Sequence, residues 1–332
     1  MASDGLICDV LSEIVALIAA ARSTPLAKLK LERVVARIET LPLDALDPIS
    51  VALRDFPIQP PQALIRFTTE ESWRAIAPEP LAPLLLFHRS GFVRQAALNR
   101  TSSLPDGPIL VVALAQRLND WVEPVRAAAA ACAERVLPSV SAKTMAAAAP
   151  YLLARFHSWQ RWGEPPPVLL EALRRDDRAA ALAATLIATT SIPGSVLKSA
   201  IRLGIVDRHL AEIARRARRP EFRAAALRPL IDGRVSWLDH YDKTWVDKRF
   251  GIARRTAVLA HRPIERQIAL SELIGIGAKD ASALVRYVAA ERLVCHAGEI
   301  GDTTALTALF KGDKSRGVRW LMAFLARQKA GG

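Results

Sequence analysis

Residues 237 to 245 are the part of the chain whose residue types and spacing could do chemistry. Two carboxylates and an imidazole stand among three aromatic rings, at Trp237, Asp239, His240, Tyr241, Asp242 and Trp245. Aromatic rings stack on nucleobases, and a carboxylate beside them can stabilise a cationic sugar. Asp239, His240 and Asp242 could approach one metal ion, but no second histidine or cysteine lies nearby to complete a shell. We therefore expect no metal site here.

Three interpretations of this segment stay open. It is a loop whose tryptophans pack on neighbouring helices, a non-catalytic binding loop, or a catalytic loop. The catalytic interpretation resembles the helical-repeat alkylpurine DNA glycosylases of the AlkD type, but their catalytic positions do not match this segment residue by residue. The chain also has no Gly-rich phosphate loop, no Gly-x-Ser-x-Gly elbow and no His-Glu-x-x-His motif. The sequence thus favours a protein that is not an enzyme and needs no cofactor.

Positive charge is concentrated after residue 200. The chain of 332 residues has a net charge of +13, and residues 201–332 hold 25 basic and 14 acidic side chains, or +11 of that total. An excess of this kind favours an anionic partner. The candidate partner-binding residues are a dense arginine cluster together with basic and aromatic residues of the following segment, namely Arg215, Arg216, Arg218, Arg219, Trp237, Lys243, Trp245, Lys248, Arg249 and Arg255.

The composition predicts that helices position these residues. Half of the chain (51%) is hydrophobic but only 6% is aromatic, and 21 prolines exceed 16 glycines, which is typical of helices separated by short turns. No uncharged apolar stretch is long enough to cross a membrane. Three cysteines, Cys8, Cys132 and Cys295, lie too far apart in sequence for a disulfide framework or metal knuckle, so we expect them buried, in a cytoplasmic protein.

A repeated motif organises most of the chain. In this motif an aspartate is followed, after five residues, by an arginine, and a valine stands directly before the arginine. It occurs at Asp120–Arg126, Asp280–Arg286 and Asp313–Arg319, and looser copies centre on Arg94, Arg223 and Arg254. The intervals between these six arginines are 32, 97, 31, 32 and 33 residues. Because 97 is close to three times 32, a period of about 32 residues with two degenerate copies between Arg126 and Arg223 fits the whole span.

The residue types at fixed positions around each arginine predict a helix. The preceding residue is apolar in every copy, and the third residue after it is alanine in five copies and Met322 in the sixth. These two positions are four residues apart, so they share one helix face, and a small residue there allows close packing. An apolar run and a polar break precede each copy, which indicates helix, turn, helix. The aspartate stands where an N-cap would bind the free amides of the second helix.

This pattern resembles the HEAT-repeat family, over roughly residues 78 to 328. The resemblance implies an all-α fold, an α-solenoid of stacked helix–turn–helix repeats. It also implies that Arg94, Arg126, Arg286 and Arg319 form a polar ladder with the aspartates of successive repeats. The copies at Arg94 and Arg223 depart from it, with His88 and Ala217 in place of the aspartate. The resemblance says little of function, because solenoids serve many functions.

The domains expected are an N-terminal cap over 1–77 and a repeat array over 78–332. The cap comprises helices near 7–21 and 26–40 and a Pro-rich connector near Pro57 to Pro61. Insertions interrupt the array near 157–167, which contains three consecutive prolines, and near 232–249. In solenoids, insertions often form the binding face.

Two functions stay open. The first is a non-catalytic scaffold that binds an acidic protein through the basic C-terminal half. The alternative is a DNA- or RNA-binding helical-repeat protein, with the tryptophan insertion engaging a base. The scaffold ranks slightly first, because no base-reading motif is visible.

Overall fold

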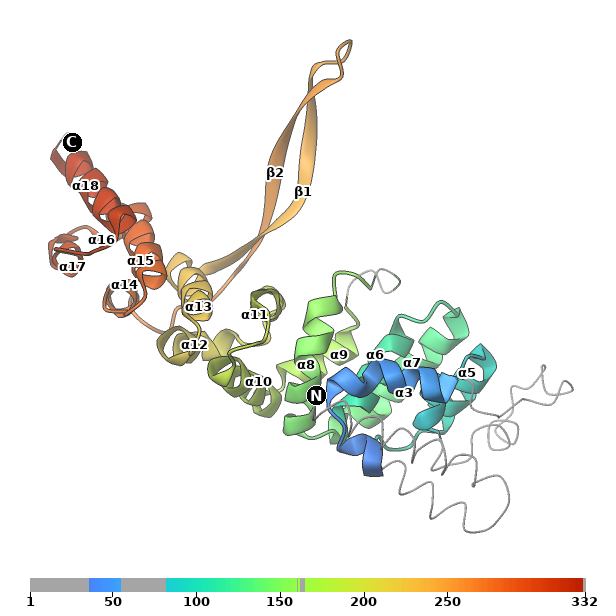
Figure 1. Ribbon diagram of the computed structural model, residues 1–332. Coiled ribbons are helices and arrows are strands. Elements are labelled where there is room, and N and C mark those ends of the chain that lie inside the picture. Colours follow the sequence, from blue (N-terminus) through green and yellow to red (C-terminus); the bar gives the residue numbers. More distant parts are fainter. Residues whose placement is uncertain (1–35, 55–81, 160, 162–164, 331–332) are drawn as a thin grey trace, which may run out of the picture. The chain divides into compact units, whose positions relative to one another are not determined.

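The computed structural model describes residues 36–54, 82–159, 161 and 165–330 (Figure 1). The chain divides into two compact units, residues 1–182 and 183–332, which are taken one at a time below. The helix expected at 7–21 and the connector near Pro57 lie outside the described residues. Of the helix expected at 26–40 only residues 36–40 are described, and 36–39 are helical. The described chain is mostly helical.

The first unit is built from helices around an apolar centre. The helix α6 is almost entirely buried from Ile109 to Ala115 and packs against α7 and α8, while α5 packs against α7. The short helix η3 adds four buried residues, Leu84 to Phe87, to the same core. The elements are η1 (Leu43–Ala45), α3 (Leu46–Arg54), η3 (Leu84–Phe87), α5 (Gly91–Arg100), α6 (Pro108–Leu118), α7 (Glu123–Val136), η4 (Leu137–Ser139), α8 (Ala142–Arg155), α9 (Pro167–Arg174) and α10 (Asp176–Ala188), which crosses into the second unit.

The second unit combines helices with one long hairpin. The helix α13 packs against α11, α12, α14 and α15, and α15 also packs against α18. Gly277 on α14 has a clear role, because a Cβ there would lie 2.5 Å from Leu227 and 2.7 Å from the Ala289 methyl. The elements are α11 (Gly194–Arg202), η6 (Asp207–His209), α12 (Leu210–Arg216), α13 (Pro220–Asp232), β1 (Arg234–Asp247), β2 (Ile252–Pro263), α14 (Leu270–Ala278), α15 (Ala283–Cys295), α16 (Ala297–Ile300), α17 (Thr304–Ala308) and α18 (Arg316–Ala330).

The insertion predicted at 232–249 is not a loop but part of this antiparallel hairpin of β1 and β2 (Figure 1). The prediction of a motif helix at Arg254 is therefore wrong, since Arg254 lies in β2 opposite Thr244. The hairpin spans 234–263, or 30 residues, which nearly equals the period of the motif. For this reason Arg254 falls on the expected spacing by coincidence.

The motif arginines share one contact that the sequence does not reveal. In each of them Nη1 donates a hydrogen bond to the backbone carbonyl six residues earlier, at 2.7–3.0 Å; these arginines are Arg94, Arg126, Arg223, Arg286 and Arg319. Arg178 on α10 makes the same contact at 3.1 Å, although the sequence analysis selected no arginine there. Arg178 lies between Arg126 and Arg223, where the period predicts two degenerate copies of the motif, and these copies stay a prediction. Its sequence, Arg178-Ala-Ala-Ala-Leu, repeats that of Arg223-Ala-Ala-Ala-Leu and was the available signal.

The motif aspartates pair with an arginine of the preceding motif. Arg94 contacts Asp120 with both Nε (2.9 Å) and Nη2 (2.8 Å). Arg223 contacts Asp280 at 2.7 and 2.9 Å, and Arg286 contacts Asp313 at 2.6 and 3.2 Å. The paired residues Arg223 and Asp280 are separated by 57 positions in the sequence, whereas Arg286 and Asp313 are separated by 27. The difference of 30 equals the length of the hairpin, which is inserted between Arg223 and Asp280.

The aspartates are not N-caps, which corrects the prediction for Asp120 and Asp280. The N-cap residues are Val122 on α7 and Ser282 on α15. Each aspartate instead accepts a hydrogen bond from the backbone N–H two residues later, at 3.0 Å for Val122 and 2.7 Å for Ser282. The carboxylate thus closes the turn before the helix and leaves its other lone pairs for the arginine.

The close packing predicted around the motif arginines is found where the motif is helical. The residues before the arginine, Val93, Val125, Phe222, Val285 and Val318, are all at most 1% exposed, and so are the alanines three residues after it on α5, α7, α13 and α15. The cysteines divide: Cys132 is buried, as predicted, but Cys295 is exposed, and Cys8 lies outside the described residues.

Candidate nucleic-acid interface

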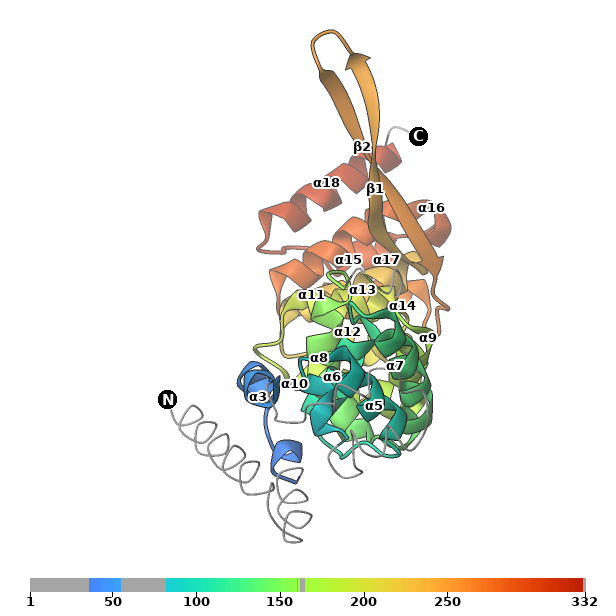
Figure 2. The same cartoon turned by 90° about the vertical axis from the view of Figure 1, so that its right-hand side faces the viewer.

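The hairpin projects from the second unit and contacts helices of that unit near its base. Figures 1 and 2 show β1 and β2 extending away from α11 and α13, which β1 contacts. Arg262 fixes the base by pairing with Asp207 through both Nη atoms, at 2.6 and 2.7 Å. Trp237 is half-buried there, with the Arg202 guanidinium 5.0 Å from its ring centroid. Of the candidate aromatic residues, Trp237 thus lies in the anchor.

One face of the outer hairpin combines cations and aromatic rings. Alternate residues of a strand share a face, and directly paired residues of antiparallel strands share it too. The register pairs Lys243 with Arg255, and Tyr241 and Trp245 flank Lys243 on the same face, opposite Ala257 and Ala253. Tyr241 is 57% and Trp245 44% exposed. The Lys243 Nζ lies 3.6 Å from the Trp245 ring centroid, a cation–π contact.

The paired cations on this face lack a carboxylate of their own. Like charges directly opposite each other destabilise a strand pair. Among the described residues, neither Lys243 nor Arg255 makes an ion pair, because the hairpin's three aspartates are used elsewhere. Asp239 and Asp242 hold His240, at 2.9 Å from Nδ1 and 3.2 Å from Nε2, and Asp242 lies on the opposite face. An anion supplied by a partner would relieve the repulsion between Lys243 and Arg255.

His240 belongs to the opposite face and is not a catalytic group of a closed site. Hydrogen bonding to Asp239 is the main cause that raises the pKa of His240, and the bond to Asp242 adds to it. All three side chains are more than half exposed. Within the described residues no group of three or more histidine, cysteine, aspartate or glutamate side chains could hold a metal ion.

The tip of the hairpin presents two further candidate cations. Lys248 and Arg249 lie in the turn between the strands, which Gly251 completes at a φ of +67°. Asp247 fixes this turn by accepting hydrogen bonds from the backbone N–H groups of Arg249 (2.8 Å) and Phe250 (3.3 Å). Phe250, the residue after Arg249 in this turn, is 78% exposed. The sequence analysis did not select Phe250, although an aromatic residue in a polar turn is a visible signal.

The arginine cluster of residues 215–219 lies on another element and is mostly paired. It occupies the end of α12 and the turn before α13. Arg215 pairs with Glu272 at 3.0 Å, Arg216 with Glu212 at 2.5 Å, and Arg219 with Glu221, its Nε at 2.8 Å. Only Arg218 has no ion-pair partner among the described residues. The structure therefore brings together Lys243, Trp245 and Arg255, with Lys248 and Arg249 at the tip, and leaves the arginine cluster apart.

Comparisons with known proteins add no family to this description. No protein-family model matches the chain, and no curated protein matches it at a significant level of similarity. In the part of the chain that the structure describes, no helix has both the length and the apolar character that a membrane crossing requires.

Proposed function

We propose that this chain is a HEAT-like helical-repeat protein that binds nucleic acid through its exposed hairpin. The observation that carries the proposal is the face on which Lys243 opposes Arg255 between the rings of Tyr241 and Trp245. Cations contact phosphates, and exposed aromatic rings stack on bases. The function proposed is binding only, because no carboxylate of the hairpin lies in an enclosed site.

The HEAT-like architecture is supported by the arginine–aspartate pairs. Arg94–Asp120, Arg223–Asp280 and Arg286–Asp313 each join one motif to the next, as in a polar ladder. The 30-residue hairpin interrupts the turn between α13 and α14 without breaking the second of these pairs. An insertion into a stacked repeat is a common place for a binding element. The same proposal places the protein in the cytoplasm, where free thiols such as those of Cys132 and Cys295 persist.

The charge and shape of the hairpin support nucleic acid over an acidic protein as the proposed partner. The arginine cluster, a candidate for binding an anionic partner of either kind, is largely neutralised by Glu212, Glu221 and Glu272, so among the described residues the hairpin holds most of the unpaired candidate cations. The hairpin itself holds seven Lys or Arg against three Asp over 234–263, a net charge of +4. A two-stranded ribbon fits the major groove of a duplex, where its cations reach phosphates on both sides.

Salt-dependent binding of the full chain tests this proposal. We expect a fluorescent generic duplex to bind at low salt, with log K falling linearly against log salt at about −0.9 per phosphate contact. The double variant Lys243→Gln, Arg255→Gln should weaken binding and make the slope shallower by about two contacts, or roughly 1.8. The control Arg215→Gln, Arg216→Gln removes the same charge from the paired cluster and should leave the slope within experimental error.

Two results would overturn the proposal. One is a chain that binds neither duplex nor single strand at low salt, in which case binding of an acidic polyglutamate peptide would support the scaffold function. The other is an equal change of slope in the hairpin and cluster variants, because nucleic acid would then bind by overall charge rather than by this face. Circular dichroism of both variants checks that the fold is retained.

The aromatic residues distinguish base stacking from phosphate contact alone. Trp245→Ala removes an exposed ring and should weaken single-strand binding by roughly tenfold or more, since stacking contributes about 1–3 kcal/mol per base. Trp237→Ala removes a ring in the anchor, so we expect a loss of hairpin order with a smaller, indirect effect on binding. Equal loss of binding in both variants at unchanged hairpin order would contradict the assignment of the two tryptophans.

A further inference from the structure

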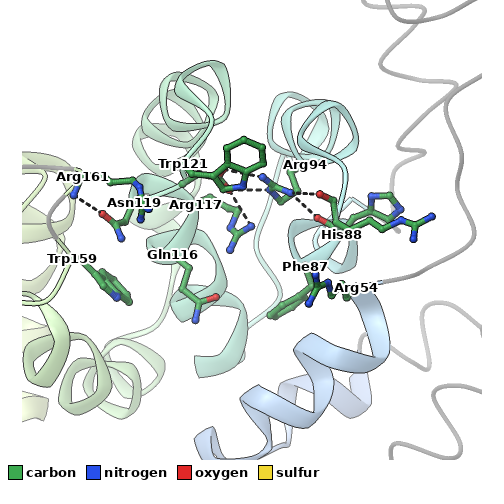
Figure 3. A pocket seen from close by; sticks show the side chains of 12 residues that line it. Arg54, Phe87, His88, Arg94, Gln116, Arg117, Asn119, Trp121, Trp159 and Arg161 are labelled. Carbon is green, nitrogen blue, oxygen red and sulfur yellow. Dashed lines mark hydrogen bonds and ion pairs between the residues drawn. The ribbon is translucent and has the colours of Figure 1, made fainter. Parts of the chain in front are cut away.

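A pocket in the first unit concentrates arginine side chains. Its volume is about 630 Å³, within the range typical of small-molecule sites. The wall comes from the end of α3 (Arg54), from α5 (Arg94), from α6 (Gln116 and Arg117) and from the segment after α8 (Trp159). In Figure 3, Arg117 and Gln116 reach into the space between Trp159 on one side and Arg54 with Phe87 on the other.

The charges of this wall do not balance. Among the described residues, it contains one carboxylate, Asp120, and five arginines: Arg54, Arg89, Arg94, Arg117 and Arg161. Asp120 is already engaged, because it accepts hydrogen bonds from Arg94 Nε (2.9 Å) and Nη2 (2.8 Å) and from the Val122 N–H (3.0 Å), and it also forms an ion pair with Arg117 Nη1 (3.1 Å). The wall keeps a positive charge that its own carboxylate does not neutralise.

Arg117 is the arginine that this imbalance affects most. Burial, the main cause, and the nearby charge of Arg94 together lower the pKa of Arg117 to about 10, although Asp120 acts to raise it. Its buried Nε makes no hydrogen bond among the described residues. A buried guanidinium with an unsatisfied donor is costly unless a further acceptor reaches it, and phosphate oxygens match its geometry.

The other walls suit a planar, polar ring. Trp159 is half-buried and faces the pocket in Figure 3, where a ring could stack on it. Among the described residues, the amide of Gln116 makes one long contact, 3.5 Å, to the Tyr151 hydroxyl, so it can both donate to and accept from a base edge. An anion, a stacked ring and an amide within one cavity together describe a nucleotide.

We propose that this pocket binds a nucleoside phosphate, with Arg54, Arg117 and Arg161 at the phosphate and Trp159 and Gln116 at the base. The proposal rests on residues of the first unit alone and does not depend on the hairpin. The same chemistry comes from two sources, a free mononucleotide or the terminal nucleotide of a 5′-phosphorylated strand.

Calorimetric titration of the full chain with adenosine 5′-monophosphate tests the pocket. We expect saturable binding that is at least about tenfold weaker for adenosine, which lacks the charged group, and weaker for inorganic phosphate, which lacks the ring. Arg54→Gln and Arg161→Gln alter exposed side chains, so the fold should survive, and each should weaken binding about tenfold. Trp159→Ala should weaken binding of the monophosphate but not of inorganic phosphate. Lys143→Gln, an exposed change on α8 outside the pocket, is the matched control.

The outcomes separate the pocket from the hairpin. Absence of binding at millimolar monophosphate, equal affinity for adenosine, or equal loss in Lys143→Gln and the pocket variants would overturn the pocket proposal. The hairpin variant Lys243→Gln, Arg255→Gln should bind the monophosphate normally, so a failure of duplex binding leaves this result untouched. In that hairpin variant, tighter binding of a 5′-phosphorylated than of a 5′-hydroxyl oligonucleotide would identify a strand end as the source, and equal binding would identify the free mononucleotide.

Discussion

Replacing Asp120 by alanine should destabilise the first unit, and the same change at Asp313 should destabilise the second unit much less. The Arg94 side chain is 3% and that of Asp120 1% exposed, so Asp120→Ala leaves a guanidinium charge buried without its carboxylate. Breaking a buried pair in this way costs about 3–5 kcal/mol. Arg286 is 17% exposed beside Asp313, so water can solvate it after Asp313→Ala, and we expect a loss of about 1–2 kcal/mol.

This ordering distinguishes an ion pair from a helix cap. Loss of an N-cap costs about 0.5–2 kcal/mol whatever the burial of a distant arginine, so the two alanine variants would then be equally affected. The assay is native-state hydrogen exchange resolved by peptide, because the two units need not unfold together. Protection should fall over α5 and α7 in Asp120→Ala and over α15 and α18 in Asp313→Ala.

A double substitution supplies the control for the Asp120 prediction. Arg94→Met with Asp120→Leu replaces the buried pair by apolar side chains of similar length, and it should cost less than the sum of the two single changes. Equal protection losses for Asp120→Ala and Asp313→Ala, or a double variant as unstable as that sum, would refute the reasoning.

Two further predictions concern the second unit. Gly277→Ala should lower the free energy of unfolding by about 1–3 kcal/mol, after the gain in helix propensity is counted, because the new methyl group meets Leu227 and Ala289. A thermal melt measures this loss. The control is Gly275→Ala, whose methyl group would have its nearest atom at 3.9 Å, and it should be neutral or stabilising. If both glycine variants melt alike, the close packing of α14 on α15 is wrong. The hydrogen bond from Arg286 is the main cause that lowers the pKa of Asp313 below its ordinary 3.8, so its stabilisation is complete above that pH and is lost as the pH falls through the lowered value. Asp313→Asn should therefore be less stable than the parent chain near neutral pH, and the difference should shrink as the pH falls below 3.8 and vanish below the lowered pKa; a difference that stays constant down to strongly acidic pH would contradict the ion pair.

The sequence predicted the helical parts well where one short pattern carried the information. The apolar residue before each motif arginine and the alanine after it are buried in the helices that contain them, because both positions follow from the helical repeat alone. The same pattern failed at Arg254, where a 30-residue hairpin stands in place of one period. Spacing alone cannot separate an inserted hairpin from a further helix pair when their lengths agree.

The candidate sites depended more strongly on tertiary structure. The sequence selected Lys243, Trp245 and Arg255, but only the strand register shows that they share one face and that Asp242 lies on the other. It also selected the arginine cluster, whose glutamate partners include Glu272, distant in the chain.

The pocket was not predicted at all, since its arginines lie on separate elements from Arg54 to Arg161 and none belongs to a recognisable motif apart from Arg94. By itself the sequence determined helix content, the motif arginines and the positive charge of the C-terminal half, because backbone periodicity and composition act over a few residues. Only the tertiary structure decided which charges are paired and which are left without a partner. That difference arises because ion pairs such as Arg223–Asp280 join residues 57 apart, and packing alone determines which distant side chains meet.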